Sequence, residues 1–155
     1  MTTVSNHTLS RLSLPWEPDA AARYFAPLAH QPWAMLLHSG FADHPHNRFD
    51  MLVAQPRVTL QTRGAVTTIA SATGVREEQA DPLALLRQAL DAMNWPGEAD
   101  PALPFTGGAM GLFGYDLGRR FESLPEQAEA DVQTPDMAVG IYDWALIVDH
   151  HLQNV

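Results

Sequence analysis

Short apolar runs bounded by turn residues recur along this chain of 155 residues, and they favour strands over long helices. One run spans residues 33–37. Another spans residues 49–55 and is apolar on both faces except at Asp50. Strands that are apolar on both faces lie in the middle of a sheet. Residues 49–55 are therefore expected to form a central strand.

A hairpin and a closing pair of strands follow from the same kind of pattern. Residues 57–62 alternate polar and apolar side chains. Arg63 and Gly64 can then turn the chain into a partner strand at residues 65–71, which is the signature of a hairpin. Residues 137–149 are expected to form one or two further strands.

The clearest helix begins at Asp81, an N-cap residue followed by proline at the first helical position, and stops at residues 94–97. Its helical spacing gathers four apolar side chains into one expected stripe: Leu83, Leu86, Leu90 and Met93. A shorter helix is expected to begin at Asp19. It should end near Ala26, because Pro27 removes an amide donor and clashes with the preceding turn.

Four glycines lie in one weakly apolar run, at Gly107, Gly108, Gly111 and Gly114. They do not form the Gly-x-Gly-x-x-Gly pattern and no lysine follows them, so phosphate binding is disfavoured. Glycines in a strand let a second element approach the backbone closely, which is the interpretation we prefer. A short helix is expected at residues 116–123.

Strands and helices without regular βαβ alternation predict an α+β fold, made mainly of antiparallel β-sheet with packed helices. The length fits a single domain over residues 1–155. The start of the chain has no secretory h-region, and no stretch is apolar enough to span a bilayer. A soluble, cytoplasmic protein that does not bind membranes is therefore expected.

The charge balance excludes several functions. The chain carries 18 Asp and Glu against 9 basic residues, a formal net charge of −9, and every basic residue is an arginine. Without lysine there is no Schiff-base or P-loop lysine. Without cysteine there is no thiol nucleophile, disulfide or thiolate metal site. An acidic chain without a basic run is also not expected to bind nucleic acid.

Histidines and carboxylates gather in one short part of the sequence. His38, His44 and His46 lie near Asp43 and Asp50, and imidazole and carboxylate groups are zinc ligands. A metal-dependent hydrolase is therefore one hypothesis. The alternative is that these are loop histidines around a turn, which the intervening proline and glycine favour.

The same turn carries a second candidate site. It is flanked by residues with binding chemistry, namely Ser39, His46, Asn47, Arg48 and Phe49. A hydroxyl, an amide, a guanidinium and an aromatic ring in one pocket suit a small zwitterionic ligand. From residue types alone, an ordinary connecting loop remains the favoured interpretation.

Three blocks of sequence resemble the aminodeoxychorismate synthase component I family. The first runs over residues 32–40 (PWAMLLHSG) and continues in residues 42–45 (ADHP) and 48–50 (RFD). The second and third are residues 107–122 (GGAMGLFGYDLGRRFE) and residues 135–144 (PDMAVGIYDW). The position before the serine of the first block holds His38, where the sister anthranilate synthase large subunit usually has an acidic residue.

The resemblance implies that the chain is the N-terminal region of a protein about three times as long, in the α/β sandwich of chorismate-utilising enzymes. It implies that the full enzyme converts chorismate and ammonia, released by a glutamine amidotransferase partner, to 4-amino-4-deoxychorismate for p-aminobenzoate and folate synthesis. The catalytic residues and the Mg²⁺ ligands would lie in the C-terminal region. No catalytic or metal-binding residue is therefore expected here, and the segment alone is expected to be inactive.

The resemblance also implies a tryptophan site in this N-terminal region, separate from the chorismate site. By motif, its residues are Ser39, His46, Asn47, Arg48 and Phe49, and a segment from the C-terminal region would complete the pocket. Two alternatives stay open. One is the N-terminal region of anthranilate synthase component I, and the other is a stand-alone module that binds a small amino acid.

Overall fold

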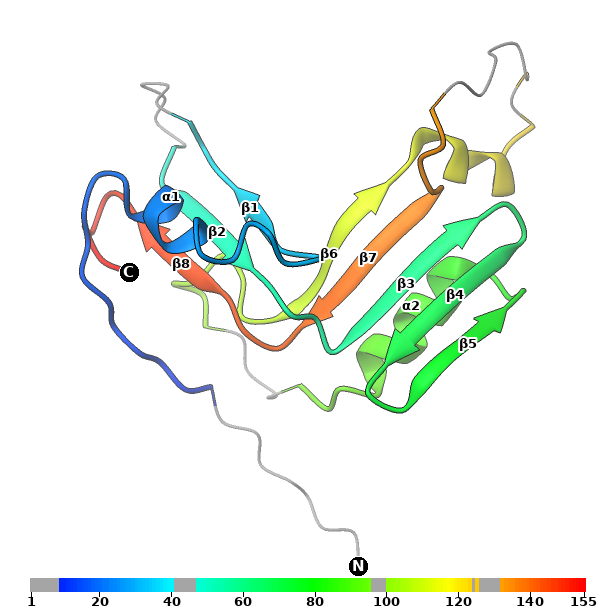
Figure 1. The fold of residues 1–155 in the computed structure, drawn as a ribbon, viewed down its shortest axis with the longest axis horizontal. Coiled ribbons are helices and arrows are strands. Elements are labelled where there is room, and N and C mark those ends of the chain that lie inside the picture. Colours follow the sequence, from blue (N-terminus) through cyan, green and yellow to red (C-terminus); the bar gives the residue numbers. More distant parts are fainter. Residues whose placement is uncertain (1–8, 41–46, 96–99, 124, 126–131) are drawn as a thin grey trace, which may run out of the picture. The chain divides into compact units, whose positions relative to one another are not determined.

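A computed structural model describes residues 9–40, 47–95, 100–123, 125 and 132–155 of the chain. They form mainly antiparallel β-sheet with few helices, which confirms the α+β expectation (Figure 1). The chain divides into two compact units. The first combines Met1–Pro56, Met93–Gly108 and Tyr142–Val155, and the second combines Arg57–Ala92 and Ala109–Ile141. No helix within the described residues is long and apolar enough to cross a membrane.

The first unit is built on a three-stranded antiparallel sheet in the order β1-β2-β8. Its strands are β1 (Met35–Leu37), β2 (Phe49–Val53) and β8 (Leu146–Asp149). β2 lies between the other two strands, so the expectation of a central strand at residues 49–55 is confirmed. The pairing of β2 with β8 brings the start of β2 beside residues about a hundred positions further along the chain.

Helix α1 (Ala20–Phe25) covers one face of this sheet. Ala20 and Ala21 are buried together with Val148 of β8, and small side chains here let the helix lie close to the strands. The helix ends at Phe25 with Ala26 as its C-cap residue, close to the expected end near Ala26. Asp19 occupies the N-cap position but makes no capping hydrogen bond, because its backbone (φ −103°, ψ 17°) is not the extended one from which a side chain caps a helix.

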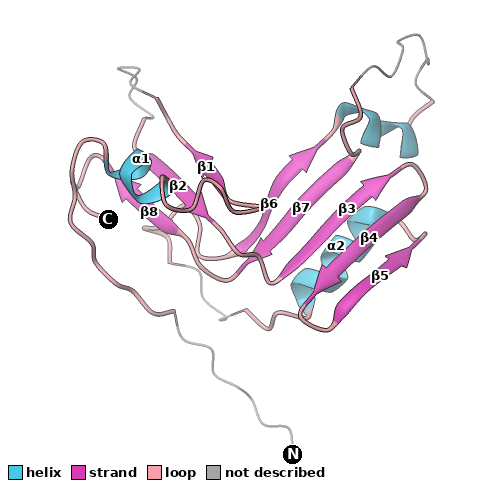
Figure 2. Ribbon diagram, viewed as in Figure 1, coloured by secondary structure: helices cyan, strands magenta, loops and turns pink. Residues whose placement is uncertain are grey.

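The second unit is a five-stranded sheet in the order β5-β4-β3-β7-β6 (Figure 2). The predicted hairpin is confirmed as β3 (Val58–Arg63) and β4 (Val66–Ser71), although its turn lies at residues 64–65. β5 (Gly74–Glu78) was not predicted, since it is a largely exposed edge strand without an apolar alternation. β7 (Met137–Tyr142) and β8 are the two strands expected within residues 137–149.

Helix α2 (Pro82–Asp91) lies across the sheet of the second unit, where it packs on β3 (Figure 2). The Asp81 carboxylate accepts a hydrogen bond from the Ala84 N–H at 3.0 Å, so the predicted N-cap is confirmed. The predicted apolar stripe is partly wrong. Leu86 is buried as expected, but Leu83 is exposed and Leu85 is buried instead. The reason is that the buried face of the helix is formed by Pro82, Leu85 and Leu86.

The core of the second unit lies between α2 and the central strands. Its side chains are almost completely inaccessible to solvent: Leu60, Ile69, Met137, Val139 and Ile141. Two threonine hydroxyls, Thr62 and Thr67, are also buried there and share a hydrogen bond of 2.9 Å across the hairpin. Each satisfies the other, as buried polar groups must be satisfied.

The glycine run forms β6 (Gly108–Phe113) and leads into a 3₁₀ helix at Tyr115–Arg120, near the short helix expected at residues 116–123. Figure 1 shows β6 and β7 running in opposite directions side by side. A Cβ atom on Gly111 would lie 2.1 Å from the carbonyl oxygen of Ala138. The predicted close backbone approach is therefore confirmed, and it occurs against β7.

Candidate ligand-binding site at the start of strand β2

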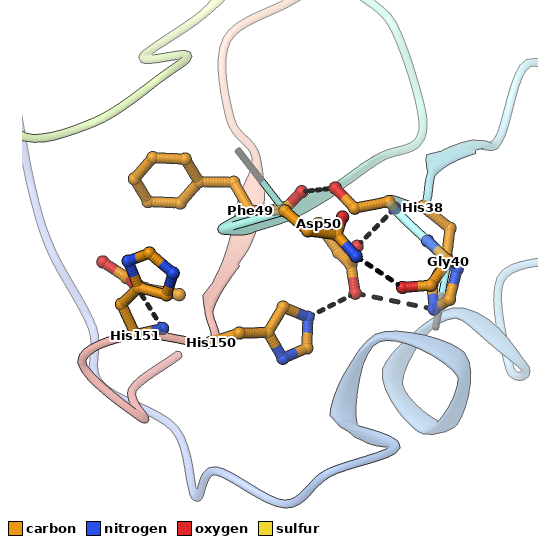
Figure 3. Close-up of polar contacts among 9 residues, drawn as sticks. His38, Gly40, Phe49, Asp50, His150 and His151 are labelled. Atoms are coloured by element: carbon orange, nitrogen blue, oxygen red, sulfur yellow. Dashed lines mark hydrogen bonds and ion pairs between the residues drawn. The ribbon is translucent and has the colours of Figure 1, made fainter. Parts of the chain in front are cut away.

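The end of β1 and the start of β2 bring Ser39 and Phe49 together, because the two strands pair in antiparallel fashion. The Ser39 hydroxyl donates a hydrogen bond to the Phe49 carbonyl oxygen at 2.6 Å (Figure 3). The Ser39 N–H donates to Asp50 Oδ1 at 2.7 Å. The two halves of the site expected from the sequence thus lie side by side.

Asn47 ties the other side of the connection back to the same place. Its side-chain amide donates to the Gly40 carbonyl oxygen at 3.0 Å. Gly40 has a φ of +73°, a conformation that glycine adopts without steric cost. His46, the remaining residue expected at the site, lies outside the described residues, as do residues 41–45.

Arg48 is held by a carboxylate of the chain itself. Its guanidinium donates through Nε and Nη2 to both oxygens of Asp149, at 2.7 to 3.1 Å. The hydrogen bond from Arg48 lowers the pKa of Asp149 below its ordinary value, and the same bond raises the pKa of Arg48. The guanidinium also lies over the Phe49 ring, with its carbon 4.5 Å from the ring centroid, a cation–π geometry.

This pairing refines the role that the residue types suggested for Arg48. The Arg48 guanidinium was expected to bind the carboxylate of a ligand through two hydrogen bonds. Its Nε and Nη2 atoms instead bind Asp149. Asp149 is only 4% exposed and also accepts the N–H groups of His151 and Leu152. Arg48 therefore fixes the Phe49 ring and the turn after β8 in one arrangement.

A second carboxylate, Asp50, lies among histidines. Its Oδ2 accepts from His150 Nε2 at 2.7 Å, and His38 Nε2 lies 3.6 Å from the same oxygen (Figure 3). The other ring nitrogen of His38 accepts the Gly40 N–H at 3.0 Å. Asp50 is 1% exposed, so the Ser39 N–H and the His150 ring rather than water satisfy its carboxylate oxygens.

A groove of about 950 Å³ opens beside the site within the first unit. Its walls are mainly aromatic and apolar and include Phe49, Trp95, Phe105, Trp144 and Ile147, and Asp149 is one of its polar lining residues. Of the five residues expected to bind a ligand, Phe49 lines this groove, whereas Ser39, Asn47 and Arg48 are not among its lining residues. An apolar groove with a few polar groups at its edge suits a small aromatic ligand.

The hypothesis of a metal centre at His38, His44 and His46 receives no support from the described residues, which contain no group of three or more His, Asp or Glu able to hold an ion. His44 and His46 lie outside those residues. His38 instead contacts Asp50 and the Gly40 N–H.

Sequence reasoning missed Asp149 and His150 as members of this site. Asp50 was noted from the sequence as the one polar interruption in an apolar strand and as a carboxylate near the candidate zinc-binding histidines, but not as a partner of Ser39. The two downstream residues carry no local signal, because they reach the site through the pairing of Phe49 with Asp149 between β2 and β8. Only a long-range contact could have found them.

The chain is similar to known proteins of one enzyme family. No protein-family model matches the chain. Among solved structures, anthranilate synthase component I from Streptococcus pneumoniae superposes with a TM-score of 0.57 at 23% identity, over 93% of this chain and 30% of that one, so the two share a fold. Anthranilate synthase component 1 of Mycobacterium tuberculosis is 31% identical over 137 residues, 86% of this chain and 26% of that protein. The chain therefore falls in the family of chorismate-utilising enzymes.

The sequence identity is higher to one kind of protein in that family than to the anthranilate synthases. Aminodeoxychorismate synthase component 1 of Klebsiella aerogenes is 63% identical over 144 residues, and that of Escherichia coli 57%. Each alignment covers 93% of this chain and 32% of the relative, so the chain spans about a third of the length of these relatives. The chain is a homologue of the N-terminal region of aminodeoxychorismate synthase component 1.

Proposed function

We propose that the chain is the N-terminal, tryptophan-binding part of an aminodeoxychorismate synthase component 1. The observation that carries this proposal is the identity of 63% over 144 residues to a relative of that name. The geometry supports it, because four of the five residues expected at the tryptophan site converge on one turn.

The reaction proposed for the complete enzyme is the conversion of chorismate and ammonia to 4-amino-4-deoxychorismate, a precursor of p-aminobenzoate and folate. A glutamine amidotransferase subunit would supply the ammonia, in keeping with the designation component 1 of the relatives. The enzyme would work in the cytoplasm. The segment described here would be inactive on chorismate by itself.

Magnesium is the cofactor expected of the family, and the carboxylates of the candidate site do not fit it. Asp50 and Asp149 are the two carboxylates of the site, but Asp50 is engaged by a backbone N–H and an imidazole and Asp149 by a guanidinium. Mg²⁺ requires near-octahedral oxygen ligands with free lone pairs. We therefore place the ion, and the reaction centre with it, outside this segment.

The chemistry of the site suits the two ends of tryptophan. An indole is large and flat, and the aromatic walls of the groove that include Phe49 and Trp144 can bury it. The α-ammonium needs oxygen acceptors, which the Ser39 hydroxyl and the carbonyl groups of the turn supply.

The experiment that tests the reaction uses the complete enzyme with its amidotransferase partner, chorismate and glutamine, and identifies the product by mass spectrometry. Formation of 4-amino-4-deoxychorismate is expected. If anthranilate is the product instead, the chain belongs to the sister enzyme. Turnover of chorismate by the purified 155-residue chain would contradict its assignment as a non-catalytic segment.

Tryptophan binding is tested on the chain itself. L-tryptophan should raise its melting temperature in proportion to the logarithm of ligand concentration, because the ligand stabilises the folded state by mass action. Ser39→Ala and Arg48→Ala should each reduce the shift. If other amino acids produce the same shift as tryptophan, the chain is a module that binds small amino acids without this preference.

A further inference from the structure

We propose that Asp50 is a positioning residue for the ligand site, whose buried carboxylate fixes the Ser39 turn by linking it to His150 (Figure 3). The inference rests on the proposed function, since the site that Asp50 would position is the proposed tryptophan site. Asp50 itself is 1% exposed and does not line the groove, so it would act through Ser39 rather than touch the ligand.

The geometry gives each carboxylate oxygen its own partner. Oδ1 accepts the Ser39 N–H at 2.7 Å, and Oδ2 accepts His150 Nε2, also at 2.7 Å. His38 approaches Oδ2 at 3.6 Å and binds the Gly40 N–H through its other nitrogen. One side chain of β2 thus joins the end of β1 to the turn that follows β8.

The location of Asp50 shows that packing alone does not explain it. It pairs with Val148 of β8, a fully buried residue of the apolar cluster under α1. An apolar side chain at position 50 would extend that cluster. A buried carboxylate is instead costly unless hydrogen bonds compensate it, so the bonds to Ser39 and His150 are the reason that a charge can be kept there.

Asp50 and Asp149 hold residues of the site by hydrogen bonds on opposite faces of the sheet. Val148 and Asp149 are consecutive in β8, so their side chains alternate between the faces, and Asp50 shares the face of its partner Val148. Asp149 fixes Arg48 on one face, and Asp50 fixes Ser39 on the other. Removal of Asp50 should therefore release the Ser39 turn while the contact between Arg48 and Asp149 remains.

The test compares Asp50→Ala and Asp50→Asn in the full chain, with Thr62→Val as a control that removes a buried hydroxyl from the second unit. The side chain introduced by Asp50→Asn can still accept the Ser39 N–H, and its NH₂ group can donate to His150 once that ring takes its other tautomer. Two quantities are measured on each folded variant, namely the hydrogen-exchange rate of the Ser39 amide by NMR and the Kd for L-tryptophan by calorimetry.

Asp50→Ala should accelerate exchange at Ser39 and weaken tryptophan binding, each by about tenfold or more, as loss of a hydrogen bond to a charged group implies. Asp50→Asn should bring both quantities back to within about threefold of the parent, and Thr62→Val should change neither beyond that range. An unchanged Ser39 exchange rate in Asp50→Ala overturns the proposal. An equal loss of affinity in Thr62→Val overturns it too, because the effect would then follow stability alone.

The design separates failure of this inference from failure of the proposed function. If neither this chain nor the complete enzyme binds tryptophan, the proposed function fails, and faster exchange at Ser39 in Asp50→Ala still supports the linking role of Asp50. If Asp50→Ala does not fold, His150→Ala takes its place, because it removes the partner of Oδ2 and leaves the bond to Ser39 without its anchor. Unchanged Ser39 exchange in that variant overturns the proposal.

Discussion

Gly111→Ala is the substitution whose effect follows most directly from the structure. A Cβ atom there would lie 2.1 Å from the Ala138 carbonyl oxygen and 2.7 Å from the Val139 Cα. Both atoms belong to the backbone of β7, which lies in the buried core and cannot swing aside as a flexible side chain does. To remove this clash β6 would have to move away from β7 by about 1 Å, because non-bonded carbon atoms pack at about 3.5 Å.

The cost should lie at the upper end of the range for overpacking, at about 3 kcal/mol or more, since strand separation also weakens hydrogen bonds between β6 and β7. For a chain of this length that is a fall in melting temperature of about 6–12 °C, measured by differential scanning calorimetry. Gly114→Ala is the matched control, because its Cβ would lie 3.0 Å from the Asp136 carbonyl oxygen, and about 1 kcal/mol is expected. If Gly111→Ala melts within about 2 °C of the parent, the close approach of β6 to β7 is refuted.

Two further predictions concern a carboxylate and a helix cap. Because Arg48 lowers the pKa of Asp149, the folded state binds this proton less readily than the unfolded chain does. The stability that Asp149 contributes is fully present above its unfolded pKa of about 3.9 and is lost as the pH falls through its lower folded pKa. In Asp149→Asn, the free energy of unfolding should therefore fall less steeply with decreasing pH below about pH 4 than it does in the parent chain. Asp81→Ala removes the cap of α2 and should lower the free energy of unfolding by about 1 kcal/mol, measured by urea titration, and an unchanged midpoint would contradict the capping role.

Local patterns were enough to predict the strands and helices whose ends are marked by turn chemistry. The hairpin of β3 and β4 follows from the alternation around Gly64, and the start of α2 follows from Asp81. β5 has no such pattern, because an edge strand exposed on most of its length needs no apolar alternation. Leu83 was misplaced because helical spacing fixes which residues share a face but not which face meets the sheet.

The residues of the candidate site also divide into those that local sequence predicts and those that depend on long-range strand pairing. Ser39 and Phe49 flank one turn, so the sequence alone could place them together, and the structure joins them through a hydrogen bond. The two groups that organise the site, Asp149 and His150, come from the far end of the chain. Their positions depend on the pairing of β2 with β8, and nothing in the neighbouring sequence of either strand specifies that partner.

The central claim is that the turn between β1 and β2 binds tryptophan, and titration of the ¹⁵N-labelled chain with L-tryptophan tests it most directly. The largest changes in amide chemical shift are expected at Ser39, Asn47, Arg48 and Phe49, with little change in the strands of the second unit. Shifts confined to the second unit, or none at millimolar ligand with the chain folded, would contradict the claim.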